Sequence, residues 1–290
     1  LASLRGAVSL VRPSAHDPLF PRLWWEAVRI SDPAFARSLA VINWPHTDET
    51  RLEAACAAAD SVVAYGSYTT IASLSCRIRP HQIFLGHGTR HSFAIVDASA
   101  LSPDTSRNTA QALAYDLSVY DQQGCLSPRA VFVAENGAVT PADFARLLAE
   151  EMRRLARRLP RHELSLEESA ALARERDTAL LDAALGADRA VVSRPDDPFL
   201  ITIGKRPAGT LSAVNRHADV RPFRDAGEVA AALQPFMGSV STLGIAGSVD
   251  SWRPLMASVG AARLCPAGQM QKPPLGSCHD GVTPLTDIAR

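Results

Sequence analysis

The 290-residue chain is 47% hydrophobic, and its 30 Lys and Arg residues balance its 30 Asp and Glu residues to a formal net charge of +0. This length and apolar content can bury one large core or two moderate ones, and the balanced charge excludes a general attraction to nucleic acid or anionic membranes. The apolar run from Ala54 to Ala64 is broken by Asp60 and falls short of the roughly 20 residues that span a bilayer, so no membrane span is predicted.

The five cysteines lie at positions 56, 76, 125, 265 and 278, an odd number without CxxC spacing. This pattern argues against a disulfide framework or a zinc ribbon and favours a reducing cytoplasm. The sequence begins without Met and lacks the ordered regions of a signal peptide, so we expect a chain that is cut at its start.

The first hundred residues alternate between strand and helix patterns. Short apolar runs over residues 7–11 and 61–65, each followed by polar turn residues, predict two buried strands. Apolar residues at helical spacing predict helices over residues 19–30 and 50–60. This order is typical of βαβ units and a parallel sheet.

A second patterned region surrounds Cys125. A strand over residues 92–96 is followed by a helical pattern from 106 to about 120 and by a strand over 130–133. Cys125 therefore lies in a loop between a helix and a strand. We expect a domain boundary near residue 100, where a polar stretch joins the two regions.

Two helix starts follow in the sequence. Thr140-Pro141 and Ser165-Leu166 each place a capping hydroxyl before an early helical position, with an acidic residue in the first turn. They predict helices that reach about residues 159 and 186. The last third contains a helix near 227–233, a strand near 238–245 and a Pro-rich tail.

Cys125 is the first candidate for chemistry. Its neighbour Gly124 has no side chain, which lets another backbone or a ligand approach the sulfur closely. A cysteine thiolate is a strong nucleophile, and its thioester stays electrophilic enough for a second attack. Because a lone cysteine is more often a small buried hydrophobe, the residues alone leave both interpretations open.

Short motifs punctuate nearly the whole chain: Arg12-Pro13-Ser14, Tyr65-Gly66-Ser67, Ser92-Phe93-Ala94-Ile95-Val96-Asp97, Gln122-Gln123-Gly124-Cys125, Arg263-Leu264-Cys265-Pro266-Ala267-Gly268-Gln269-Met270-Gln271-Lys272-Pro273-Pro274 and His279-Asp280-Gly281. In order and spacing they resemble the aldehyde dehydrogenase superfamily. More specifically, they resemble the acyl-CoA reductases of the LuxC type, the fatty acid reductase of bacterial bioluminescence.

The resemblance implies an α/β, aldehyde dehydrogenase-like fold, with a Rossmann-like cofactor domain that is incomplete at its N-terminus and an α/β catalytic domain. Residues 1–100 would form the partial NAD(P)-binding domain and 101–262 the catalytic domain with the nucleophilic cysteine. Residues 263–290 would form a tail that returns toward the cofactor domain. An incomplete sheet exposes a strand edge, so we expect a homo-oligomer.

The resemblance also implies a reaction, in which Cys125 attacks an activated acyl carbonyl and the thioester is reduced by NADPH to an aldehyde. Arg12 and Ser14 would contact the adenosine ribose, where a cation also attracts a 2′-phosphate, with NAD as the alternative cofactor. Gly66 and Ser67 would meet the pyrophosphate at a helix N-terminus. Taken alone, Gly66-Ser67 is an ordinary turn and Arg12 a surface arginine.

Two pairs of histidine-containing positions need separate interpretations. His279 and Asp280 are candidates for catalytic acid–base work or for orienting a loop, because His beside an acidic residue serves either purpose. His87 and His91 have the i, i+4 spacing of metal ligands on a helix, but the glycines around them predict a loop. No metal site is therefore predicted.

The chain departs from the family pattern in three places. The segment 84–88 replaces a Glu-Leu-Gly-Gly-Lys run whose Glu is the base for thioester hydrolysis, so exchange with a thiol such as CoA fits better than release of free acid. The Glu-x-Phe-Gly-Pro run, whose Glu holds the nicotinamide ribose, has no match around 198–201. The oxyanion-hole Asn belongs to a segment before Leu1, and loss of such a donor costs about 3 kcal/mol.

The leading prediction is NADPH-dependent reduction of a fatty acyl-CoA or another activated acyl group. One alternative is a CoA-acylating, NAD-dependent aldehyde dehydrogenase, and another is a non-catalytic truncated homologue with a subunit or regulatory role. The expected partners are an acyl-CoA or acyl-enzyme donor, supplied, as the resemblance suggests, by an acyltransferase or acyl-protein synthetase.

Overall fold

The computed structural model describes residues 6–15, 17–274 and 276–282, which form two compact units. Unit 1 contains the described residues up to Thr89 and those from Gly276 onward, and unit 2 contains those from Arg90 to residue 274. This boundary lies before the one predicted near residue 100, because the strand that begins at His91 is hydrogen-bonded to strands of unit 2. The predicted tail 263–290 is also divided, since residues 263–266 form a strand of unit 2.

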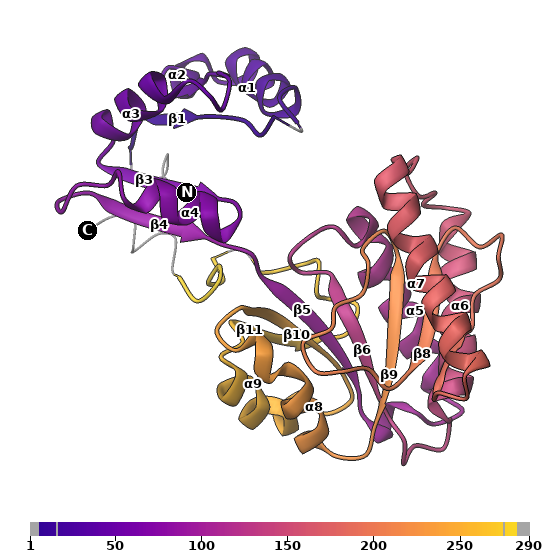
Figure 1. Ribbon diagram of the computed structural model, residues 1–290. Coiled ribbons are helices and arrows are strands. Elements are labelled where there is room, and N and C mark those ends of the chain that lie inside the picture. Colours follow the sequence, from indigo (N-terminus) through magenta and orange to yellow (C-terminus); the bar gives the residue numbers. More distant parts are fainter. Residues whose placement is uncertain (1–5, 16, 275, 283–290) are drawn as a thin grey trace. The chain divides into compact units, whose positions relative to one another are not determined.

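Unit 2 is built on a seven-stranded sheet with the order β11-β10-β5-β6-β9-β8-β7 (Figure 1). In chain order its strands are β5 (His91–Val96), β6 (Pro128–Ala134), β7 (Arg189–Val191), β8 (Leu200–Gly204), β9 (His217–Phe223), β10 (Val240–Ala246) and β11 (Arg263–Pro266). β7 pairs antiparallel with β8, and the other neighbours are parallel. The predicted α/β class with a parallel sheet is confirmed.

The central strands of this sheet are buried on both faces. Phe93, Ile95, Val131 and Val133 are each 0% exposed. Continuous apolar runs are what a parallel sheet needs when helices cover both of its sides. Such runs predicted β5, β6 and β10, and these three strands are confirmed.

Helices cover both faces of the sheet. On one side lie α5 (Ser106–Ser118), α6 (Pro141–Ala156) and α7 (Leu166–Ala184), and on the other lie α8 (Ala226–Leu233) and α9 (Arg253–Val259) (Figure 1). The two predicted helix starts are confirmed. Asp143 N donates to Thr140 Oγ1 at 3.1 Å, and Ser165 and Glu168 form a reciprocal capping box at the start of α7.

Unit 1 contains two parallel strand pairs, β1 (Ser9–Val11) with β2 (Leu39–Val41) and β3 (Ser61–Tyr65) with β4 (Ile83–His87). Its helices are α1 (Phe20–Ser31), α2 (Pro33–Ala36), α3 (Glu49–Ala58) and α4 (Tyr68–Ser75). The chain runs strand, helix, strand within each pair, which confirms the predicted βαβ order. β2 and β4 were not among the predicted strands, because one is short and the other carries a glycine and a histidine.

Within the described ranges, none of the helices combines the length and the apolar character needed to cross a bilayer.

Candidate active site

Cys125 lies in a tight turn between α5 and β6, as predicted. Ser127 N donates to Gly124 O at 3.0 Å, which closes the turn around Cys125 and Leu126. The Cys125 side chain is exposed, whereas Cys265 of the same unit is buried and burial raises the pKa of its thiol. Cys125 is therefore a cysteine of unit 2 that a substrate can reach.

Ser92 of β5 anchors the backbone of Cys125. Its hydroxyl donates to Cys125 O at 2.6 Å and accepts from Thr242 N at 3.1 Å, and the side chain is 0% exposed. Ser92 lies where the registers of β5 with β6 and with β10 both shift. The hydroxyl thus supplies hydrogen bonds at a place where the regular strand ladder is interrupted.

The C-terminal motif holds the other side of the turn. Gln271 Nε2 donates to Ser127 Oγ at 2.9 Å and to Asp116 O at 3.2 Å, which joins the turn to α5. Gly124 is part of this arrangement, since a Cβ at that position would lie 3.9 Å from Gln271 Oε1. The motif that carried the family resemblance therefore contacts the turn that carries Cys125.

Asp116 ties the same motif to α5. This residue is 0% exposed, and its carboxylate accepts a hydrogen bond from Gly268 N at 2.5 Å. Burial raises the pKa of Asp116 to about 6, although N–H groups of Gly268, Met270 and Gln271 oppose the shift. Sequence reasoning missed Asp116, because one Asp within a helical pattern gives no sign of burial.

The predicted pyrophosphate turn of unit 1 has the expected strand, turn and helix order. Gly66 follows β3, and Ser67 caps α4 by accepting from Thr70 N at 3.2 Å. Gly66 N donates to His87 O at 3.1 Å, so this N–H is already used. The N–H groups of Tyr68 and Thr69 begin the helix without intrahelical acceptors, and such groups fit a phosphate.

Arg12 follows β1, and its guanidinium lies over the indole ring of Trp44, 5.3 Å from the ring centroid. Its Nη2 also donates to Trp44 O at 3.3 Å. Ser14 lies in the same turn and forms a bridge with Asp17. Since ligands of parallel sheets bind beyond the carboxyl ends of the strands, the exposed Arg12 and Ser14 fit a contact with a nucleotide.

His279 and Asp280 gather with two residues at the ends of β3 and β4. His87 Nδ1 and Asp280 Oδ2 are 3.0 Å apart, and their side chains are 7% and 4% exposed. The His87 ring stacks with the rings of Tyr65 and His279 at centroid distances of 4.6 and 4.3 Å, and the centroids of Tyr65 and His279 are 5.6 Å apart. His279 Nδ1 also lies 3.4 Å from the Tyr65 hydroxyl. This geometry fits the loop-orienting role.

Potential metal ligands occur in this cluster, since one ligand atom from each of His87, His279 and Asp280 lies within 4.8 Å of the others. The direct hydrogen bond between His87 and Asp280 accounts for their approach without an ion. The loop predicted around His87 and His91 is wrong in detail, because His87 ends β4 and His91 begins β5. Their i, i+4 spacing is therefore not that of a helix.

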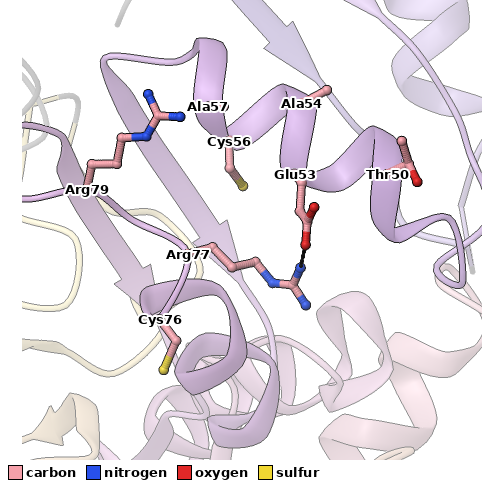
Figure 2. A pocket seen from close by; sticks show the side chains of 8 residues that line it. All are labelled: Thr50, Glu53, Ala54, Cys56, Ala57, Cys76, Arg77 and Arg79. Carbon is pink, nitrogen blue, oxygen red and sulfur yellow. Dashed lines mark hydrogen bonds and ion pairs between the residues drawn. The ribbon is translucent and has the colours of Figure 1, made fainter.

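A pocket of ≈ 580 Å³ lies between α3 and the segment after α4 (Figure 2). Its lining residues are Thr50, Glu53, Ala54, Cys56, Ala57, Cys76, Arg77 and Arg79. Arg77 Nη1 approaches Glu53 Oε1 at 3.5 Å, and burial raises the pKa of the Cys56 thiol. None of the predicted cofactor residues lines this pocket, so we assign it no role.

Comparison with solved structures places the fold. An NAD-dependent aldehyde dehydrogenase from Burkholderia multivorans is 14% identical, with a TM-score of 0.64 over 98% of this chain and 57% of its own. An oxidoreductase from Marinobacter aquaeolei is 13% identical, with a TM-score of 0.69 over 93% of this chain and 57% of its own. The predicted aldehyde dehydrogenase-like fold is confirmed.

Comparison of sequences identifies the family. The long-chain acyl-protein thioester reductase 2 of Photobacterium leiognathi is 27% identical over 86% of this chain and 50% of that protein. The long-chain acyl-protein thioester reductase of Vibrio harveyi is 24% identical over 99% of this chain and 59% of that protein. This chain thus spans about half the length of these curated relatives. The family model for acyl-CoA reductase (LuxC) matches residues 2–290, and the chain belongs to that family.

Proposed function

We propose that Cys125 is the nucleophile of an acyl reductase, which accepts an acyl group as a thioester and releases it as an aldehyde. The observation that carries this proposal is the exposed Cys125 on a turn held by Ser92 and Gln271, in a member of the acyl-CoA reductase family. A fixed and reachable thiol is what acyl transfer to cysteine requires.

The proposed reaction has two steps. In the first, the Cys125 thiolate attacks the acyl carbonyl of a thioester donor, a new carbon–sulfur bond forms and the donor thiol leaves. In the second, hydride adds to the acyl carbon, the bond to Cys125 breaks, and the thiolate takes up one proton as the aldehyde leaves. A backbone N–H of the turn is the proposed donor to the oxyanion of each tetrahedral species.

The acyl donor follows from the relatives. Those described above are named long-chain acyl-protein thioester reductases, which favours a long acyl chain delivered from a protein thioester. A fatty acyl-CoA presents the same thioester and is the alternative donor. An acyltransferase or acyl-protein synthetase that charges the donor is the proposed partner.

The proposed cofactor is NADPH, which supplies the hydride when bound, with NAD as the alternative. In unit 1, Arg12 and Ser14 would contact the adenosine ribose, and the turn at Gly66 and Ser67 would bring the first N–H groups of α4 to the pyrophosphate. The guanidinium of Arg12 favours the extra 2′-phosphate of NADPH. Asp280 and His279 would orient the loop that packs on His87.

The test is transfer of a radiolabelled long-chain acyl group from acyl-CoA to the protein. We expect labelling of the wild type and of Cys76→Ala, which removes another exposed cysteine, and none of Cys125→Ala. Addition of NADPH should discharge the label as an aldehyde. Equal labelling of Cys125→Ala would exclude it as the nucleophile, and a wild type that takes no label would support the non-catalytic alternative.

A further inference from the structure

We propose that Asp121, Gln122 and Arg216 are positioning residues for Cys125. They belong to two segments of unit 2, one formed by residues 120–122 before the turn at residues 124–127 and one formed by residues 215–217 at the start of β9. The inference rests on the proposed role of Cys125, and it assigns to these segments the placement of the thiol for acyl transfer.

The segment 120–122 has an unusual backbone. Tyr120, Asp121 and Gln122 have φ values of 54°, 49° and 63°, so three successive residues other than glycine are left-handed. In this conformation the Cβ crowds the backbone, and such residues persist only where their surroundings enforce it. Tyr120 is 72% exposed, so packing of its own ring does not supply the enforcement.

The segment 215–217 enforces the left-handed backbone of residues 120–122. Asn215 and Arg216 are also left-handed, with φ values of 65° and 67°. Asn215 N donates to Asp121 O at 3.0 Å, and Arg216 Nε donates to Asp121 Oδ1 at 2.5 Å. Asn215 Oδ1 accepts from Gln123 Nε2 at 2.8 Å. Two strained segments therefore hold each other through main-chain and side-chain hydrogen bonds.

Arg216 makes this contact from the interior. Its side chain is 2% exposed, and besides Asp121 it donates to Leu159 O at 2.8 Å and to Pro160 O at 3.3 Å. A buried guanidinium must have all its partners in place, because an unpaired charge without water is strongly unfavourable. The position of Asp121 is thus fixed by an ion pair that cannot relax into solvent.

Gln122 fixes the next residue in the same way. This residue is 1% exposed, and its Oε1 accepts from His217 N at 2.7 Å. Its Nε2 donates to His217 O at 2.8 Å and to Pro128 O at 2.7 Å. The side-chain amide therefore joins the first residues of β6 and β9, ahead of the point where these strands pair with each other at Val131 and Val220.

The location of these contacts points to function. A helix and a strand can be joined through ordinary backbone conformations, yet this connection keeps three strained residues that only Gln123 separates from Gly124 and Cys125. Strain that the surrounding structure maintains beside a reactive group is a device for fixing that group. With Ser92 holding the carbonyl of Cys125, the turn is fixed on both sides.

The test compares Arg216→Lys and Gln122→Glu with Arg189→Lys. Arg189 is a buried arginine of the same unit, and its ion pairs are with Glu175 and Asp182, which lie outside both segments. We expect the first two variants to lose about 10- to 100-fold in the rate of acyl transfer from acyl-CoA, since small misplacements of reacting groups have effects of that size. Arg189→Lys should keep the wild-type rate of acyl transfer even if its thermal midpoint falls as much as the midpoints of Arg216→Lys and Gln122→Glu.

A second measurement needs no acyl donor. The rate of Cys125 alkylation by iodoacetamide as a function of pH reports the environment of the thiol, and we expect Arg216→Lys and Gln122→Glu to shift this profile while Arg189→Lys leaves it unchanged. Wild-type alkylation profiles in both variants would overturn the positioning role. A shifted profile in a protein that accepts no acyl group would support the role while refuting the proposed reaction.

Discussion

The Gly268 N–H donates to the Asp116 carboxylate at 2.5 Å, although the two residues are 152 positions apart in the sequence. This bond secures the C-terminal motif to α5, and Gln271 of the same motif donates to Ser127 in the turn around Cys125. The motif is therefore part of the structure that supports Cys125, and its integrity can be tested at both ends of the bond.

Asp116→Asn should stabilise the protein at neutral and alkaline pH. Because burial raises the folded-state pKa of Asp116 from 3.8 to about 6, the folded protein favours the protonated acid, and this contribution to stability is lost as pH rises from about 4 through 6. At pH 8 the ionised carboxylate lowers stability by roughly 3 kcal/mol at 1.36 kcal/mol per pKa unit. We expect a higher thermal midpoint for Asp116→Asn at pH 8 and no gain at pH 4. A midpoint that is lower at pH 8 would contradict this assignment.

Gly268→Ala should destabilise unit 2 more than Gly186→Ala does. Both glycines have φ near 80°, so each substitution carries the left-handed cost of about 1–2 kcal/mol. A Cβ at position 268 would also lie 3.0 Å from the Cβ of Ala112, whereas one at position 186 meets nothing within 4 Å. Thermal unfolding of the two variants measures the difference, and equal losses would show that the close approach to α5 has no energetic weight.

Tyr120→Gly should raise the thermal midpoint, because glycine adopts the left-handed conformation of position 120 without the cost of about 1–2 kcal/mol. Tyr120→Ala is the matched control, since it removes the same exposed ring and keeps the Cβ. The gain should appear only in the glycine variant. If the alanine variant gains as much, the ring and not the backbone is the source of the effect.

His162 should make the support of Asp121 sensitive to pH. Its Nδ1 lies 2.7 Å from Asp121 Oδ2, and hydrogen bonds to Asp121 and then to Glu168 raise its pKa above the usual value. A raised pKa means that the contribution to stability is complete below about pH 6.5, the usual value for histidine, and is lost as pH rises through the folded-state pKa.

His162→Gln tests this relationship. Because Arg216 and Arg161 face the same carboxylate, Asp121 keeps cationic neighbours when His162 is neutral. The variant should have a lower thermal midpoint than the wild type at pH 6 and the same midpoint at pH 9. A constant difference across this range would show that the charge of His162 is not involved.

Arg12→Ala should weaken binding of NADPH more than binding of NADH. Loss of a hydrogen bond to a charged group costs about 1.5–3 kcal/mol, which corresponds to a rise in Kd of about 10- to 100-fold. Arg22→Ala removes another exposed arginine of unit 1 and should leave both Kd values unchanged. Equal effects of Arg12→Ala on the two cofactors would remove Arg12 from recognition of the 2′-phosphate.

The sequence predicted those elements that are set by local chemistry. The caps at Thr140 and Ser165 and the apolar strands β3, β5 and β6 follow from residues close to one another in the chain. β9 was missed, because His217, Asp219 and Arg221 suggest a polar segment. All three are buried, Thr202 hydrogen-bonds to His217 Nε2 and to Asp219, and Asp219 forms an ion pair with Arg221.

The candidate site shows the same division. Motifs proposed Cys125, Gly66 and Ser67 as site residues, but they did not indicate the partner of Asp280, because His87 is 193 residues away in the sequence. Arg216 is a charged residue that sequence reasoning places on the surface, yet it is among the largest fully buried side chains. Such positions depend on which distant segments meet, and one sequence does not contain that information.

The hydrogen bonds that anchor the turn around Cys125 also determine when this turn can form during synthesis. Gln123 bonds to Asn215, 92 residues later, and Ser127 bonds to Gln271, 144 residues later. A ribosome that has just released the segment around Cys125 has not yet made either partner. The thiol therefore gains its fixed geometry only when translation of the described chain is almost finished, so a nascent chain that ends before Gln271 carries the cysteine without the site.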